Sequence, residues 1–252
     1  MSRIGFIGTG HIAAPMVRFL VGKGHQVTVS ERNAGVAAAL ARSHGVPVAA
    51  NQAVIDASDV VFLSVRPQIA EEVLAPLIFR AGQQIVSVMA GVSHARLTSL
   101  CAPADDISVT IPLGYLEQGG CPLPVWPDDH LLRTFFAPEN PVFAVADERA
   151  LNMHFAVCAM LPGILDLMAT GAEWLTDQTG DAAQADFYAA QLIAGYLTAM
   201  TKEAGALARE RDGLATEGTI SIQMTRALRG GGAHVALRNA MAAIGDRLEG
   251  KS

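Results

Sequence analysis

The stretch RIGFIGTGHIAAPM, at residues 3–16, decides the fold that this sequence predicts. Its apolar first half predicts a buried strand, and the apolar residues from Ile12 onward recur at helical spacing. Between them, Gly8 permits a tight turn, Gly10 leaves the backbone open to a ligand, and Ala13 is small enough for close packing of helix on strand. This order of strand, glycine turn and helix predicts a dinucleotide-binding fold with the pyrophosphate at the helix N-terminus. An ordinary strand–helix turn is the alternative.

The alternation of strand and helix patterns continues as far as about residue 147. Because helices separate the strands, right-handed crossovers and a mostly parallel, doubly wound sheet are expected. The predicted fold class is therefore an α/β Rossmann-type N-terminal domain over residues 1–147, followed by an all-α C-terminal dimerisation domain. Apolar runs predict strands at 3–7, 26–30, 46–49, 59–65, 84–89 and 107–111, with edge strands at 122–126 and 142–145.

After residue 147 the strand pattern disappears, and residues 148–252 predict a helical domain. These helices are rich in Ala, Leu and Met. Extensive exposed apolar surface usually marks a subunit contact, so we expect a homodimer that forms through the two long helices of this domain. The long helices are expected at 148–175 and 181–211, and shorter ones at 219–229 and 233–249.

The composition argues against several classes of function. The 252 residues carry a formal net charge of −6, so no basic surface for nucleic acid is predicted. The three cysteines are widely spaced and odd in number, which indicates reduced thiols and neither a disulfide framework nor a metal site. The first strand leaves no room for a leader peptide, and the most apolar stretch, 155–169, is expected to be too short to span a membrane. We therefore expect a cytoplasmic protein with no metal and no membrane partner.

Two charged residues at the end of the second predicted strand bear on the choice of cofactor. A carboxylate at Glu31 can accept hydrogen bonds from the ribose hydroxyls of NAD, and it repels the additional phosphate of NADP. The neighbouring Arg32 is suited to bind that phosphate instead. The sequence therefore predicts that NAD or NADP binds, with NAD at least competitive.

Three segments resemble the pyrroline-5-carboxylate reductase family, in the same order along the chain. The first is the glycine turn at 8–13, in which His11 stands where the family usually has Asn. The second, SVRPQ at 64–68, is similar to the family's [SA]-V-K-P-Q segment. The third, SVMAGVS at 87–93, is similar to its I-S-x-x-A-G-V-S segment. The resemblance covers nearly the whole chain, strongly in the first half and weakly in the second.

This resemblance implies a homodimeric NAD(P)H-dependent reductase of a cyclic imine, with chemistry of the proline biosynthesis type. Because the cofactor carries the hydride, the protein is expected to supply binding, orientation and electrostatics. Ligands of open α/β sheets bind at the carboxyl ends of strands, where the resemblance places the cofactor contacts. Strand-ending turns, and a helix cap at Asn51, are the alternative roles. The residues expected to bind the cofactor are Gly8, Thr9, Gly10, His11, Ile12, Glu31, Arg32, Asn51, Ser64, Val65, Pro67, Ala90 and Gly91.

The second half departs from the family's pattern in the segments that hold the substrate. The family's M-P-N-T-P, G-S-G-P and S-P-G-G-T-T segments correspond here to IPLGY, AMLP and TEGTIS, the last at 216–221. Glu217 brings a negative charge close to where the family binds a carboxylate, so the imine or imino acid substrate stays open. Ser221 is the first candidate donor to the imine nitrogen and Thr219 the second, although either hydroxyl could instead cap the helix that follows.

Two other functions are compatible with the sequence. A β-hydroxyacid-type dehydrogenase on the same scaffold needs a lysine on a helix that faces the nicotinamide, and Lys202 is the only lysine in the long predicted helices. A non-catalytic dinucleotide-binding dimer is the second alternative, because the substrate segments have lost most of the family's residues.

Overall fold

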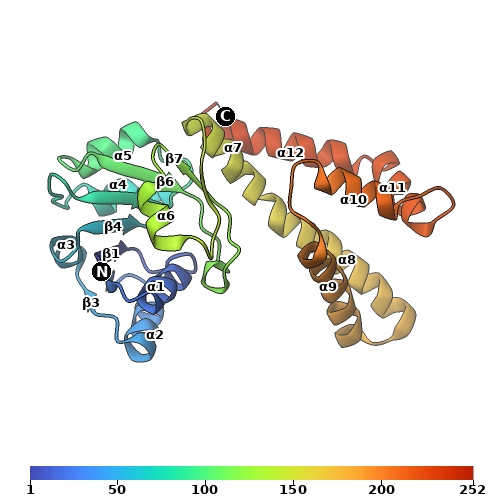
Figure 1. Cartoon of the computed structure of the whole chain (residues 1–252), viewed down its shortest axis with the longest axis horizontal. Coiled ribbons are helices and arrows are strands. Elements are labelled where there is room, and N and C mark those ends of the chain that lie inside the picture. Colours follow the sequence, from blue (N-terminus) through green and yellow to red (C-terminus); the bar gives the residue numbers. More distant parts are fainter. Residues whose placement is uncertain (252) are drawn as a thin grey trace. The chain divides into compact units, whose positions relative to one another are not determined.

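The computed structural model describes residues 1–251 and divides the chain into two compact units (Figure 1). The first unit comprises Met1–Phe155 and the residues from Gly245 onward, and the second comprises Ala156–Ile244. The boundary expected after residue 147 thus lies within the first unit, which also takes in the C-terminal residues. A mostly parallel sheet with its helices forms the first unit and helices alone form the second, so the predicted fold class is confirmed. Dimerisation through the helical part stays a prediction.

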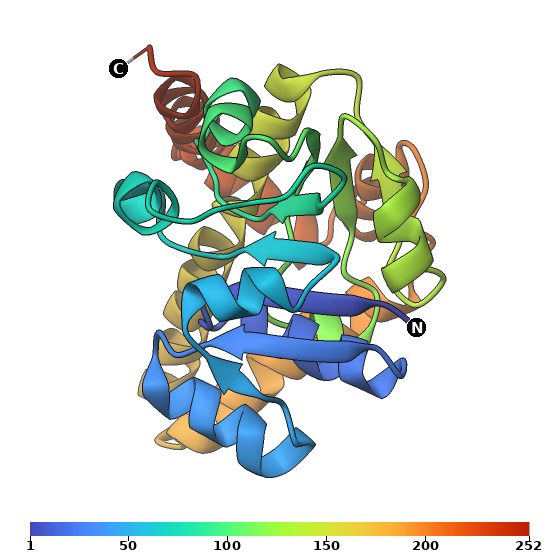
Figure 2. The same ribbon diagram turned by 90° about the vertical axis from the view of Figure 1, so that its left-hand side faces the viewer.

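The first unit is built on one eight-stranded sheet with the order β3-β2-β1-β4-β5-β6-β7-β8, seen in Figure 2. Neighbouring strands are parallel except β6 and β7, which are antiparallel. From β1 the chain moves outward to β2 and β3 and then returns to β4 on the other side of β1, which makes the ends of β1 and β4 a topological switch point. The strands are β1 (Arg3–Ile7), β2 (Gln26–Ser30), β3 (Val48–Ala49), β4 (Val60–Leu63), β5 (Gln84–Ser87), β6 (Asp106–Thr110), β7 (Leu123–Trp126) and β8 (Val142–Ala144).

Aromatic residues form the centre of the first unit's core. The rings of Phe6 on β1 and Phe62 on β4 stack with their centroids 4.7 Å apart, and the ring of Phe136 meets Phe62 edge-on. All three side chains are fully buried, which fixes the two central strands against each other. The helices of this part of the chain are α1 (Ala13–Gly22), α2 (Ala34–His44), α3 (Asn51–Asp56), η1 (Pro67–Ile69), α4 (Ala70–Leu74), α5 (His94–Cys101), η2 (Leu116–Gln118) and α6 (His130–Phe136).

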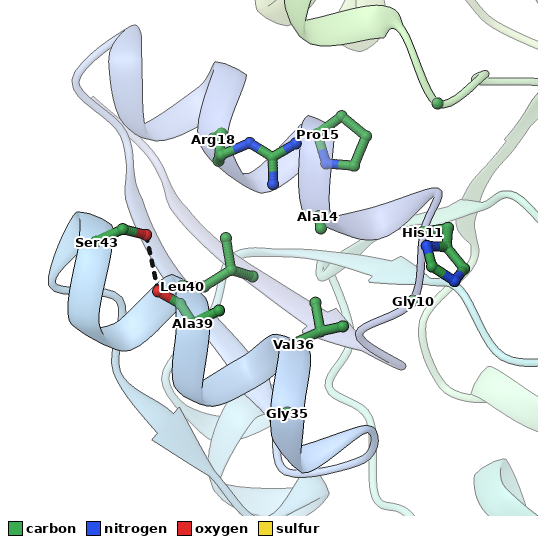
Figure 3. A pocket seen from close by; sticks show the side chains of 11 residues that line it. Gly10, His11, Ala14, Pro15, Arg18, Gly35, Val36, Ala39, Leu40 and Ser43 are labelled. Atoms are coloured by element: carbon green, nitrogen blue, oxygen red, sulfur yellow. Dashed lines mark hydrogen bonds between the residues drawn. The ribbon is translucent and has the colours of Figure 1, made fainter.

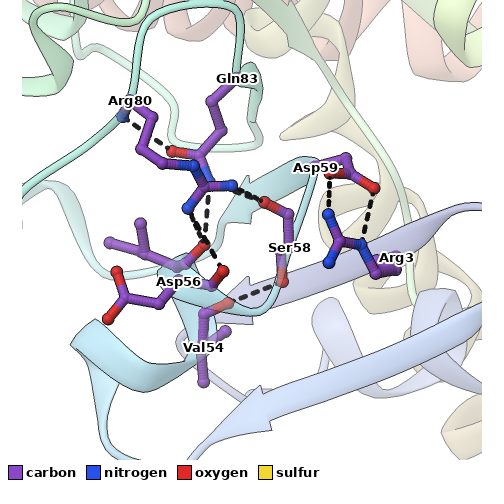
Figure 4. A network of polar contacts seen from close by, with 8 residues as sticks. Arg3, Val54, Asp56, Ser58, Asp59, Arg80 and Gln83 are labelled. Atoms are coloured by element: carbon purple, nitrogen blue, oxygen red, sulfur yellow. Dashed lines mark hydrogen bonds and ion pairs between the residues drawn. The ribbon is translucent and has the colours of Figure 1, made fainter.

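A polar network fixes the amino ends of β4 and β5 (Figure 4). The guanidinium of Arg80 donates to the carbonyls of Ile55 and Ser58 at 3.0 and 2.6 Å. The side-chain amide of Gln83 donates to the same two carbonyls at 2.9 Å each. These carbonyls lie at and just beyond the C-terminal end of α3, where a helix leaves acceptors without intrahelical partners. The network therefore secures the edge of the sheet opposite the carboxyl ends of the strands.

The two long helices expected after residue 147 are each divided in the structure. The first is interrupted at Ala159, just before Pro162, a residue that suits the first turn of a new helix. The second stops at Met200, whose backbone is extended, and restarts after Gly205, which adopts a left-handed conformation. The helices are α7 (Glu148–Cys158), α8 (Met160–Thr179), α9 (Ala182–Ala199), α10 (Ala206–Leu214), α11 (Ile220–Gly230) and α12 (Ala233–Leu248).

The second unit buries little apolar surface of its own. Its buried hydrophobic residues are the alanines at 156, 172, 185 and 206. Large apolar side chains on its helices are instead exposed, among them Trp174 at 64%, Phe187 at 68% and Leu192 at 54%. These helices therefore present broad apolar faces, as the sequence predicts.

The stretch Glu148–Thr179, which contains α7 and α8, is long and apolar enough to cross a membrane by length and composition alone. The sequence-based expectation concerns residues 155–169 alone, and the helical stretch that contains them is longer. The absence of a membrane partner stays a prediction. Only 11% of the most apolar window of this stretch is buried within the chain. A protein partner would cover such a surface as well as a membrane would.

Candidate functional site

The glycine turn after β1 is clamped between the ends of two neighbouring strands. The backbone N–H of Gly8 donates to Ser30 Oγ at 2.8 Å, and Thr9 Oγ1 donates to the Ser30 carbonyl at 3.0 Å, both in buried surroundings. On the other side, a Cβ on Gly8 would lie 2.4 Å from the Ser64 carbonyl oxygen. The φ of Gly8 is also +93°, so both space and conformation require glycine here. Ser30 is a structural partner that the sequence did not reveal.

The N-terminus of α1 lies open beside this turn. No side chain caps it and its first turn contains no acidic residue. A Cβ on Gly10 would find no described atom within 4 Å, so the fold itself leaves this position free. His11 is exposed and Ile12 is half-buried. Free N–H groups and the helix dipole make this terminus suitable for an anion, and Gly10 keeps the approach clear. The residues present therefore fit a pyrophosphate.

A cavity of about 540 Å³ runs from this turn along the groove between α1 and α2 (Figure 3). His11 lies near one end of it, and Arg18 and Ser43 lie near the other. Arg18 forms an ion pair with Glu117 at 2.5 Å, so its charge is already compensated. The volume falls within the usual range for ligand pockets. The complete lining is Gly10, His11, Ala14, Pro15, Arg18, Gly35, Val36, Ala39, Leu40, Ser43 and Gly114.

The end of β2 carries the two charges expected to select the cofactor. Glu31 and Arg32 are both exposed, and neither forms an ion pair with another residue in the described chain. Asn33 follows in a left-handed conformation, with φ of +62°, and leads into α2, whose N-terminus has no side-chain cap. Both charges are thus available to a ribose or a phosphate at this strand end.

The loops after β4 and β5 lie at the same edge of the sheet, because both strands are parallel to β1. Ser64 donates its N–H to the Ile7 carbonyl at 2.8 Å, and Val65 is buried. Pro67 is exposed and begins η1, as its fixed φ favours. Ala90 and Gly91 follow β5, and Gly91 has a φ of +75°. The strand order therefore brings the predicted cofactor residues of four strands to one edge.

Asn51 belongs to the first turn of α3 and does not cap it. The N-cap position is Ala50, and no side chain there accepts a hydrogen bond from the helix. The alternative role of Asn51 as a cap is therefore wrong. Its half-buried side chain follows β3, the strand next to β2 at the edge of the sheet.

The candidate catalytic hydroxyls lie in the second unit, at the start of α11. Thr219 caps this helix: its Oγ1 accepts from the Ile222 N–H at 3.2 Å and donates to the Thr216 carbonyl at 2.7 Å. Ser221 is exposed in the first turn, and within residues 1–251 its hydroxyl forms no hydrogen bond. Thr219 is thus engaged structurally, whereas the hydroxyl of Ser221 is free to meet a ligand.

Two charged residues of the second unit differ from what the sequence predicts. Glu217 accepts two hydrogen bonds from the Arg226 guanidinium, at 3.3 and 2.7 Å, so its negative charge is compensated on the protein surface. Lys202 lies between α9 and α10 and not within a helix, with its Nζ 3.4 Å from the Met200 carbonyl. The expectation that Lys202 lies on a long helix is therefore wrong.

Comparisons with known proteins match the first part of this chain to one family model. Residues 3–91 match the family model described as NADP oxidoreductase, coenzyme F420-dependent. A sequence comparison with curated proteins gives no match.

Solved structures match the whole chain. A pyrroline-5-carboxylate reductase from Coxiella burnetii is 19% identical with a TM-score of 0.82, over 100% of this chain and 98% of its own. The Plasmodium falciparum pyrroline carboxylate reductase, solved with NADP bound, is 14% identical with a TM-score of 0.81, over 100% and 98%. A reductive aminase from Aspergillus terreus, in complex with NADPH and ethyl levulinate, is 21% identical with a TM-score of 0.63, over 99% and 93%. The resemblance to pyrroline-5-carboxylate reductases is therefore confirmed for the fold.

Proposed function

We propose that this protein is an NAD(P)H-dependent reductase of a carbon–nitrogen double bond, similar in its chemistry to pyrroline-5-carboxylate reductase. The observation that carries the proposal is the open N-terminus of α1 beside the clamped Gly8–Gly10 turn, at the edge where β1, β2, β4 and β5 end. The family model over residues 3–91 and the fold of the whole chain support it. A cytoplasmic location and a role in proline biosynthesis belong to the same proposal.

Different residues at this edge of the sheet would bind different parts of the cofactor. The N–H groups at the start of α1 would hold the pyrophosphate, and the loops after β4 and β5 would hold the nicotinamide half. Glu31 would bind the ribose of NAD, whereas Arg32 would bind the additional phosphate of NADP. When bound, the reduced nicotinamide supplies the hydride for the imine carbon. The choice between NAD and NADP depends on which of these exposed charges dominates.

The imine nitrogen requires a proton as the carbon accepts the hydride. Ser221 is the better candidate for this donor, because Thr219 already uses its hydroxyl in both directions to close the start of α11. Removing the Ser221 hydroxyl is expected to lower turnover without changing cofactor affinity. Wild-type turnover in Ser221→Ala would exclude this role.

We further propose that the protein works as a homodimer through its helical unit. The exposed apolar side chains of α8 and α9 are not covered within the described chain. Covering large side chains of this kind contributes about 1.5–3 kcal/mol for each one that becomes fully buried. A second copy of the same surface supplies the apolar partner that these helices lack.

The proposed reaction is tested by following NADPH and NADH oxidation with a panel of cyclic imines, with and without a carboxylate, and of keto acids. We expect turnover with at least one imine and none with 2-keto acids. Gly10→Val tests the position of the pyrophosphate, because its side chain would enter the open approach to α1, where a Cβ meets no described atom within 4 Å. We expect this variant to fold and to lose cofactor binding.

The alternatives predict different results in the same assay. Turnover with keto acids alone would favour a hydroxyacid dehydrogenase. Cofactor binding with no turnover of any imine would favour a non-catalytic dinucleotide-binding dimer. Unchanged cofactor affinity in folded Gly10→Val would contradict the proposed position of the pyrophosphate.

A further inference from the structure

The start of α5 is held by one local side chain and by one from a distant part of the chain. Ser93 caps the helix locally, since its Oγ accepts from the Arg96 N–H at 3.2 Å. The N–H of His94, the first residue of α5, donates to Glu148 Oε1 at 2.7 Å. Glu148 is the first residue of α7, and a carboxylate is favourable at the positive end of a helix. Thus α7 supplies a second cap to α5, although Glu148 and His94 are 54 residues apart in the sequence.

His94 itself is fixed on its other sides. Its Nε2 lies 3.1 Å from the Ile107 carbonyl on β6, and its ring meets the ring of Trp126 edge-on, with centroids 5.0 Å apart. The ring is thus tied to the sheet while the backbone N–H is tied to Glu148. The first residue of α5 therefore has little freedom to move as long as the carboxylate is in place.

The loop before this helix packs against the same part of the first unit. Its residues Gly91, Val92 and Ser93 line a cavity of about 270 Å³ together with the start of α7 and the last residues of the chain around Leu248. A Cβ on Gly91 would lie 3.5 Å from Leu248 Cδ2, an ordinary contact distance. The loop after β5 is therefore shaped by α7 and α12 as well as by the strand that precedes it.

We propose that Glu148 is a positioning residue for this loop. By accepting from His94, it fixes the start of α5 and, through it, the conformation of Ala90 and Gly91. The inference rests on the proposed function, in which this loop holds the nicotinamide half of the cofactor. The adenosine half would bind at β1 and β2, which Glu148 does not contact. Loss of the carboxylate should therefore weaken binding of one half of the cofactor and spare the other.

The test compares two ligands by isothermal titration calorimetry on the full chain: NADPH, and 2′-phospho-ADP-ribose, which lacks the nicotinamide. For Glu148→Ala we expect NADPH to bind about tenfold more weakly, the size of effect of one charge-assisted hydrogen bond. We expect 2′-phospho-ADP-ribose to bind as it does to the wild type. A general loss of structure would weaken both ligands alike, so the ratio of the two affinities isolates positioning from stability.

Further variants keep the test decisive if Glu148→Ala folds poorly. Glu148→Asp keeps the charge but withdraws the carboxylate from His94, so it should behave like Ala. Glu148→Gln keeps an acceptor of the same reach and should retain most of the NADPH affinity. Arg149→Ala is the matched control on the same helix, because it breaks the ion pair with Glu249 at 3.3 Å and leaves the contact to His94. It should bind both ligands normally.

The possible outcomes separate the two proposals. An unchanged ratio of affinities in Glu148→Ala and Glu148→Asp would overturn the positioning role while leaving the reductase proposal intact. Equal losses for both ligands would overturn it as well. A wild type that binds neither these two ligands nor NADH would refute the proposed function, and the positioning role with it.

Discussion

The two units of this protein differ in how many of their large apolar side chains are buried. In the first unit, Phe6, Phe62 and Phe136 are completely buried between the sheet and its helices. In the second unit the buried hydrophobic residues are alanines, and most of the chain's exposed large apolar side chains lie there. Burial of apolar surface is the main driving force of folding. The first unit therefore contains its own stabilising core, whereas the second leaves its large apolar side chains uncovered within the described chain.

The largest effect is expected from substitutions in the exposed apolar surface of α9, and it concerns the stability of the dimer. Tyr188 and Leu192 lie one helical turn apart and are 57% and 54% exposed. Replacing both by Glu would place charges on the proposed interface. We expect dimer dissociation to become easier by at least about a hundredfold, as burial of two large side chains implies. Light scattering coupled to size-exclusion chromatography measures the change.

The matched control is Ile78→Glu, which changes an exposed apolar residue of the first unit, 72% exposed. It should leave the oligomeric state unchanged. A wild type that is monomeric at micromolar concentration would contradict the interface and leave the exposed helices without an explanation.

The core of the first unit should show the next largest effect. Phe62→Ala removes a ring that stacks on Phe6 and contacts Phe136, and the cavity should cost about 3–5 kcal/mol in the free energy of unfolding. Urea unfolding followed by circular dichroism measures it. Phe143→Ala, at a partly exposed site, should cost far less. Similar losses for the two variants would mean that the stacked rings do not form the core.

The polar network at the amino ends of β4 and β5 should contribute less than the core. Arg80→Met leaves the carbonyls of Ile55 and Ser58 with fewer donors, and Gln83 can replace only part of the loss. A cost of about 1–3 kcal/mol is expected from buried acceptors that lose a charged partner. The same unfolding assay applies, with Arg42→Met, an exposed residue on α2, as a control that should change little.

The smallest expected effect is a dependence of stability on pH that comes from His25. Burial lowers the pKa of His25 from its usual 6.5, and the positive N-terminus adds to the shift. The unfolded chain therefore binds this proton more readily, so stability is complete above pH 6.5 and falls as the pH decreases toward the lower folded pKa. His25→Asn should flatten the curve in this range. An equally steep fall in the variant would assign the effect to other groups.

The local signals of the first unit were sufficient to predict its architecture. Residues 3–16 formed the strand, turn and helix as expected, because Gly8 and Gly10 carry backbone requirements that are visible in the sequence. The later strands were found at slightly different lengths, since the ends of a strand depend on its neighbours. The roles of Ser30 and Glu148 could not be predicted, because their partners lie 22 and 54 residues away and no local pattern marks them.

The second unit was predicted less well for a related reason. An apolar, Ala-rich sequence continues the helical pattern through residues 159 and 200–205, although the chain breaks there. Because this unit has hardly any core, no pattern of buried residues in the sequence marks where the helices end. Thr219 and Ser221 both carry a hydroxyl and lie two residues apart, so the sequence could not show which of them caps α11. The choice depends on the residue at which the helix begins.

The chain leaves the first unit after Phe155 and re-enters it at Gly245. At this junction the two crossing segments lie close together, since a Cβ on Gly245 would be 3.1 Å from Met153 Cε. In topological terms the helical unit is an insertion with adjacent ends. A short loop that joins these ends could replace it without stretching the backbone. The first unit is thus laid out as a host domain, and the helical unit is an insert that a shorter or a different segment could replace.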